Sequence, residues 1–132
     1  MEEGRFKLDD FELYRFAREF RKKTYLLVRQ LPPEEKYALA NQMRRAAVSV
    51  ASNIAEGQGR LTRGEFQQFL GHSRGSLLEL ETQVAIALDL HYLTEGEFTV
   101  LEDRTSEVRR LLNGLLNSLR AKSKNATNES ET

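Results

Sequence analysis

The chain has 132 residues, of which 39% are hydrophobic and 30% are charged, and its formal net charge is zero. This length and composition are typical of one globular domain with enough apolar side chains to form a core without staples. The absence of cysteine excludes disulfides, thiolate chemistry and cysteine-based zinc sites.

The charge pattern also bears on location and partners. The first ten residues carry six charged side chains, unlike the apolar core of a signal peptide. No apolar run approaches the roughly 20 residues that span a bilayer. We therefore expect a cytoplasmic protein with no membrane partner. Because phosphate binding needs a positive surface, a chain of zero net charge must bind nucleic acid through local clustering or assembly.

The first predicted helix runs from about Asp10 to Leu31, and Pro32 and Pro33 end it. Residues 1–9 are expected to form a flexible N-terminus. Apolar side chains recur at helical spacing at Leu13, Phe16, Phe20, Leu27 and Leu31.

The second predicted helix runs from about Glu34 to Glu56, and two acidic residues suit its positive amino end. Gly57 is expected to supply a left-handed cap. The core stripe consists of Ala40, Met43, Ala47, Val50 and Ile54.

Two further helices begin with capping-box spacing, at Thr62 with Glu65 and at Thr94 with Glu97. The stripe of the third helix consists of Phe66, Leu70, Ser73, Leu77, Leu80, Val84, Ala87 and His91. We expect His91 to be packed and hydrogen-bonded. The stripe of the fourth helix consists of Phe98, Leu101, Thr105, Val108, Leu112, Leu115 and Leu119.

Stripes that alternate steps of three and four favour slightly inclined packing of neighbouring helices. The sequence therefore predicts an all-α fold, an antiparallel up-down-up-down four-helix bundle over residues 10–121. Residues 122–132 have almost no apolar side chains and are expected to be disordered.

A polar stripe beside the core stripe of the second helix is the most distinctive feature. We interpret it as a hydrogen-bonded structural seam against the third helix, since a half-buried polar group must be paired. Small residues at Ala47, Ala51 and Ala55, answered by Gly71 and Gly75, would let the two backbones approach. The predicted seam residues are Arg44, Arg45, Ser49, Asn53, Glu56, Gly57, Glu79 and Glu81.

Specific pairs and one alternative follow from folding the third helix back on the second. Arg44 and Arg45 could pair with Glu79 and Glu81, and Glu56 could meet Arg60 or Arg63. The alternative is a phosphate or nucleotide site at the turn after Gly57, although two glycines are a weak signal for one.

Basic side chains gather on the outer face of the first helix, opposite its apolar stripe. This strip is either a solvated face or a candidate surface for the phosphates of RNA or DNA. The candidate nucleic-acid-binding residues are Arg15, Arg18, Arg21, Lys22, Lys23 and Arg29.

Catalytic and metal-binding patterns are weak. The paired carboxylates lack a neighbouring nucleophile, and the bundle has no Glu-x-x-His pair of the kind that holds two metals. His72 and His91 stand too far apart on one helix to share an ion. We expect no catalytic residue, no metal and no cofactor.

Two sequence blocks carry a family resemblance. "QMRRAAVSVASNIAEGQGR" at residues 42–60 and "FQQFLGHSRGSLLELETQVAIALDL" at residues 66–90 resemble the bacterial four-helix-bundle family of ribosomal RNA intervening-sequence proteins. The resemblance implies an up-down-up-down bundle, a homopentamer and kinship with the accessory variability determinant proteins of diversity-generating retroelements. Those relatives are basic pentamers that bind a reverse transcriptase and nucleic acid, whereas this chain is neutral.

The sequence thus supports a non-catalytic oligomeric scaffold that binds nucleic acid through the basic surface of its first helix. The alternative is an adaptor for a protein partner such as a reverse transcriptase, without direct nucleic-acid binding.

Overall fold

The computed structural model describes the backbone of residues 8–131 and the side chains of residues 12–121. Four α-helices and one short 3-10 helix make up the described chain: α1 (Leu8–Val28), η2 (Pro33–Glu35), α2 (Leu39–Gln58), α3 (Arg63–Asp89) and α4 (Glu95–Glu131). No strand occurs among these residues, so the predicted all-α four-helix fold is confirmed.

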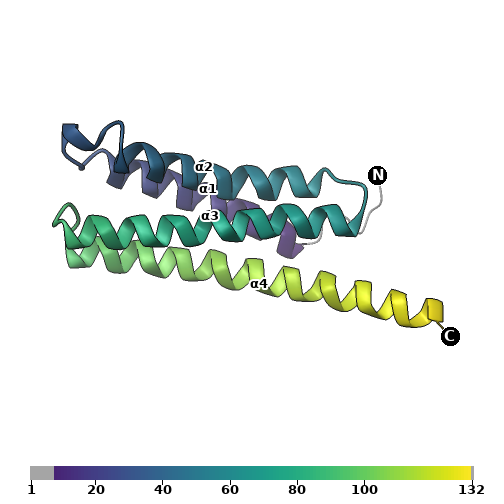
Figure 1. Ribbon diagram of the computed structural model, residues 1–132. Coiled ribbons are helices and arrows are strands. Elements are labelled where there is room, and N and C mark those ends of the chain that lie inside the picture. Colours follow the sequence, from purple (N-terminus) through teal and green to yellow (C-terminus); the bar gives the residue numbers. More distant parts are fainter. Residues whose placement is uncertain (1–7, 132) are drawn as a thin grey trace.

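The helices lie lengthwise side by side, and the chain reverses direction at the end of each one (Figure 1). Contacts join α1 to α2, α2 to α3, α3 to α4 and α4 back to α1. Each helix therefore covers two neighbours around one core. The contact between α2 and α3 is the most extensive, in agreement with the predicted close approach of these two helices.

The predicted stripes supply most of the core. The largest fully buried side chains include Phe20, Met43, Ile54 and Leu70. Leu116 is buried in α4, whereas the predicted Leu115 is only partly buried. The core also holds the hydroxyls of two threonines, and these bond within their own helices: Thr24 Oγ1 donates to the carbonyl of Phe20 at 2.9 Å and Thr105 Oγ1 to that of Leu101 at 2.8 Å.

The amino ends of α3 and α4 are capped by the predicted threonines. Thr62 Oγ1 accepts from the N–H of Glu65 at 3.2 Å. At the start of α4 the exchange is reciprocal, with Thr94 N–H donating to Glu97 Oε1 at 2.9 Å and Glu97 N–H donating to Thr94 Oγ1 at 3.1 Å. The backbone hydrogen bond from Thr94, aided by side-chain hydrogen bonds from Gln30 and Thr94, lowers the pKa of the Glu97 carboxyl.

The amino end of α2 differs from the prediction. The helix begins at Leu39 instead of Glu34, because Pro33–Glu35 form the separate helix η2. Pro32 before η2 is extended, and Ala38 after it has a φ of −120° and a ψ of −107°, outside the helical region. The chain therefore turns twice before α2 can start.

The left-handed residue of the fold also lies elsewhere than predicted. Gly57 is an ordinary helical residue of α2, whereas His91 has a φ of 62°. At the end of α3, Tyr92 N–H donates to the carbonyl of Ala87 at 2.9 Å and His91 N–H donates to that of Leu88 at 2.9 Å. This is a Schellman ending with histidine in the usual glycine position, so His91 is exposed and the prediction of a packed His91 is wrong.

The ends of the domain stay partly a prediction. The flexible N-terminus proposed for residues 1–9 falls almost wholly outside the described residues. The tail proposed for residues 122–132 begins inside α4, whose backbone continues as a helix through Glu131. Its side chains lie outside the described ones.

Candidate functional site

The seam between α2 and α3 is a ladder of short polar contacts. Ser49 Oγ and Ser76 Oγ lie 2.7 Å apart across it. Asn53 Nδ2 donates to the carbonyl of Ser49 at 2.8 Å and lies 3.0 Å from Ser49 Oγ. Ser73, fully buried, donates its hydroxyl to the carbonyl of Val50 at 2.8 Å. The structure therefore brings together Ser49 and Asn53 of the predicted set, with two serines of α3 as partners.

Gly57 sets the closeness of the two helices near the turn. A Cβ built on Gly57 would stand 2.8 Å from Phe66 Cδ1 and 3.1 Å from Phe69 Cβ. No methyl group fits there unless the helices or rings move. Gly71 and Gly75, which were predicted to provide the close approach, are instead exposed with open space around them. That part of the prediction is wrong because these glycines point away from α2.

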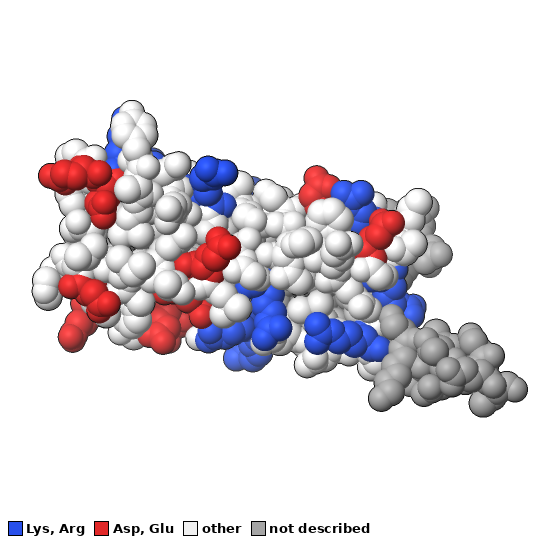
Figure 2. Space-filling view, viewed as in Figure 1, with Lys and Arg blue, Asp and Glu red and all other residues white. Residues whose placement is uncertain are grey.

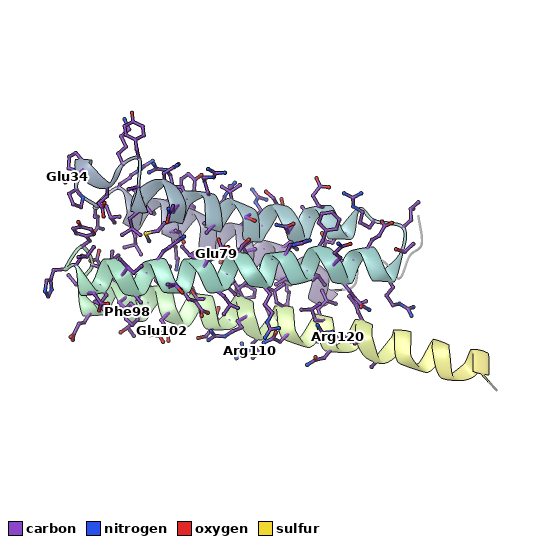
Figure 3. The ribbon with its side chains drawn as sticks, viewed as in Figure 1. Glu34, Glu79, Phe98, Glu102, Arg110 and Arg120 are labelled. Atoms are coloured by element: carbon purple, nitrogen blue, oxygen red, sulfur yellow. The ribbon has the colours of Figure 1, made fainter. Side chains whose placement is uncertain are left out.

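The predicted pairs of Arg44 and Arg45 with Glu79 and Glu81 are not found among the described side chains. Arg44 donates to the backbone carbonyl of Lys36 at 3.2 Å, and Arg45 is exposed. The arginine that pairs with Glu81 is Arg109 of α4, while Glu79 is exposed on α3 (Figure 3). Arg44 lies in the second turn of α2 and reaches back to Lys36, just after η2, instead of across to α3.

Glu56 pairs with Arg60 at 3.1 Å, as one of the two predicted options. Both side chains are exposed enough that solvent screens the pair strongly. Arg60 also lies 4.4 Å above the ring centre of Phe69. These contacts brace the turn between α2 and α3.

The same turn offers no phosphate cradle. Gly59 N–H donates to the carbonyl of Glu56 at 3.1 Å, and Arg60 N–H donates to that of Gly57 at 3.1 Å. Anion-binding loops need backbone N–H groups that point outward and unpaired. The alternative of a nucleotide site at this turn is therefore not supported.

A basic groove of about 600 Å³ runs along the outer face of α1. We call it the α1 groove, and its lining residues are Arg15, Arg18, Glu19, Arg21, Lys22, Tyr25, Leu26 and Arg29. It contains five of the six predicted basic residues and one acid, so its local charge is strongly positive although the chain is neutral. Lys23 is the exception; it does not line the groove and is partly buried.

The local sequence explains why the groove faces outward. The buried residues of α1 recur as Leu13, Ala17, Phe20, Thr24 and Val28. At about 100° per residue, Arg15, Lys22 and Arg29 fall on the opposite side of the same helix, with Arg18 close to them and Arg21 at the edge of the buried stripe. The core therefore fixes the orientation of the basic face.

Two groove arginines rest on neighbouring rings. The guanidinium carbon of Arg15 lies 5.5 Å from the ring centre of Phe16, and that of Arg18 lies 5.8 Å from the ring centre of Tyr14. None of the ion pairs found among the described residues involves a groove side chain. The positive charges therefore remain available to an anion.

Sequence reasoning missed the uncharged members of the groove. Tyr25 is 36% exposed and Leu26 is 51% exposed. Helical spacing from Lys22 could have placed both on the basic face, since they follow it by three and four residues. The predicted strip was defined by charge alone, and the two apolar side chains were therefore left out.

The described part of the chain holds no group of three or more side chains suited to a metal ion. Within it, no helix combines the length and apolar character that crossing a membrane requires.

This geometry defines the class of protein, a small all-α four-helix bundle with an internally bonded polar seam and a basic groove on one outer helix. The chain belongs to the 23S rRNA-intervening sequence protein family, whose model matches residues 9–114. The predicted family resemblance is thereby confirmed, while kinship with retroelement accessory proteins stays a prediction.

The fold is also found in a solved structure. The chain is similar to a protein of unknown function from the S23 ribosomal protein family of Bacteroides thetaiotaomicron VPI-5482, with a TM-score of 0.78 and 21% sequence identity. The match covers 83% of this chain and 99% of that one. At this identity the likeness shows the fold alone. No curated protein matches the chain.

Proposed function

We propose that the chain is a cytoplasmic, non-catalytic and oligomeric interaction protein that binds nucleic acid through the α1 groove. The observation that carries the proposal is the groove itself, where five basic side chains and one acidic side chain line one open surface. Contacts with phosphates supply most of the binding energy of such surfaces. Binding weakens as the salt concentration rises, because the release of counterions from the nucleic acid then becomes less favourable. Because the chain is neutral and its basic side chains are concentrated on one face, we favour phosphate binding over the alternative that this face is only solvated.

The test is titration of labelled structured RNA and DNA at low and moderate salt. The variant Arg15→Glu/Arg18→Glu/Lys22→Glu reverses three groove charges. A matched control, Arg45→Glu/Arg74→Glu/Arg110→Glu, reverses three exposed charges outside the groove. We expect the groove variant to abolish binding at moderate salt, and the control to retain most of it. Absence of binding at low salt, or equal losses in the two variants, would contradict the proposal.

We also propose that copies of the chain assemble through the outer face of α3. Leu78 and Ile86 on this face are 48% and 43% exposed, and Gly71 and Gly75 leave room for another backbone. Exposed apolar side chains on one face are typical of interaction sites. Figure 2 shows largely uncharged surface over this region, with acidic side chains toward one end of α4 and basic ones toward the other. Figure 3 places Glu102, Arg110 and Arg120 in that order along α4.

Assembly would raise the affinity for nucleic acid, because several copies of the groove could contact one strand at the same time. Light scattering should give a mass above that of one chain. Leu78→Lys/Ile86→Lys should reduce it, whereas Leu61→Lys, at a 90% exposed position in the turn before α3, should not. A monomeric wild type would refute assembly. Recovery of a protein partner after nuclease treatment, with no nucleic-acid binding, would favour the adaptor function instead.

A further inference from the structure

The α1 groove contains apolar surface as well as charge. Tyr25 and Leu26 line it together with Lys22 and Arg29, one helical turn apart on the same face. A groove that contacted phosphates alone would need only the basic side chains. Proteins that bind single-stranded nucleic acids use an exposed aromatic ring between cations. The bases stack on the ring, and the phosphates of the strand contact the positive charges.

We propose that the α1 groove selects unpaired nucleotides, with Tyr25 as the platform on which a base stacks. This inference rests on the proposed nucleic-acid binding and adds the kind of strand that is bound. In a duplex the base faces are covered by their neighbours, so a duplex can contact Arg18, Lys22 and Arg29 but cannot stack on Tyr25. The groove therefore holds a single strand more tightly than a duplex.

The geometry of the flanking cations supports a strand that runs along the helix. Arg15 and Arg29 are separated by 14 residues, which is about 21 Å along a helix axis. Tyr25 lies toward the Arg29 end of that distance. The ring contacts of Arg15 and Arg18 hold two of the cations near the surface before any ligand arrives, which lowers the entropy lost on binding. Several successive phosphates can therefore be contacted while one base occupies the ring.

The experiment measures binding of a labelled single-stranded oligoribonucleotide and of a hairpin duplex of the same length. Tyr25→Ala should weaken single-strand binding by about 5- to 150-fold, from the usual contribution of one base stack. Binding of the duplex should change by less than about twofold. Tyr25→Phe should keep single-strand affinity because the ring remains. Tyr37→Ala is the matched control, since Tyr37 is 85% exposed and lies beside Lys36 but outside the groove.

Thermal melting of each variant checks that Tyr25→Ala still folds. Photocrosslinking of 4-thiouridine RNA to the wild type gives an independent readout and should label the peptide that contains Tyr25. Equal affinity for hairpin and single strand, or an unchanged affinity in Tyr25→Ala, would overturn the inference. If polyglutamate displaced the RNA as well as unlabelled RNA does, the groove would be a site for acidic protein segments instead.

The outcomes separate this inference from the proposed function. If neither RNA binds at low salt, both proposals fail. Suppose that Arg15→Glu/Arg18→Glu/Lys22→Glu abolishes binding but Tyr25→Ala changes the affinities for single strand and hairpin equally. The groove then binds phosphates, and only the preference for unpaired nucleotides is wrong.

Discussion

Gly57 permits a direct test of the packing of α2 on α3. In Gly57→Ala the new methyl group would meet Phe66 Cδ1 at 2.8 Å and Phe69 Cβ at 3.1 Å. The ring of Phe66 is partly buried and can yield, but Phe69 Cβ is fixed to the backbone of α3. Overpacking of this kind costs about 1–3 kcal/mol, and alanine recovers up to about 1 kcal/mol through its helix propensity. We expect a net loss of about 1–2 kcal/mol.

Thermal and urea unfolding, followed by circular dichroism at one protein concentration, measure that loss. It corresponds to a fall of about 3–8 °C in Tm for a domain near this size. Gly114→Ala is the matched control, because Gly114 lies within α4 with open space around it. There the same change should stabilise by about 0.5–1 kcal/mol.

A second substitution tests the cause of the loss. Phe66→Ala removes the ring atoms nearest the new methyl group, so its effect and that of Gly57→Ala should couple favourably in the double variant. The reasoning is refuted if Gly57→Ala unfolds at or above the wild-type temperature while Gly114→Ala behaves as expected.

Three further predictions concern polar groups of the bundle. Ser73→Ala removes the 2.8 Å hydrogen bond to the carbonyl of Val50, and it should cost about 0.5–1.5 kcal/mol in urea unfolding, because that carbonyl keeps its helical N–H partner within α2; a neutral result would mean that the seam does not need this bond. Asn53→Ala removes two contacts with Ser49 and should cost about 1 kcal/mol, more than Glu56→Ala at its solvent-screened pair; the reverse order would contradict the assigned geometry. Because its folded-state pKa is lowered, Glu97 should stabilise the fold above its unfolded pKa and lose that contribution as pH falls through the folded value. Acid titration of stability should therefore be shallower in Glu97→Gln, and an unchanged profile would count against this assignment.

Much of the fold was predictable because the apolar spacing is strong. Leu70, Leu77 and Val84 lie in the core as their periodicity indicates, and the caps at Thr62 and Thr94 form. The end of α3 was not predictable by the same means. Its left-handed residue is histidine, and glycine is the residue that normally signals such an ending.

The candidate site was predictable in its charge but not in its partners. Basic residues on α1 could be assigned to one face from helical spacing alone. The partner of Glu81 could not be predicted, because Arg109 belongs to a different helix. Contacts between helices depend on how each helix is rotated about its axis as well as on the height of each residue along it. Gly71 and Gly75 show the same limit, since their spacing fits a close approach but the rotation of α3 turns them outward.

The short turn between α2 and α3 has a consequence for how the bundle forms. Only four residues separate Gln58 from Arg63, so docking these two helices closes a small loop at little entropic cost. Their interface is also the most extensive in the molecule. We infer that α2 and α3 form the folding nucleus, which kinetic analysis of Ser73→Ala would test through a high φ-value. On this route α1 docks onto a preformed hairpin, and the helix that carries the groove is free to accumulate surface substitutions without slowing the step that commits the chain to its fold.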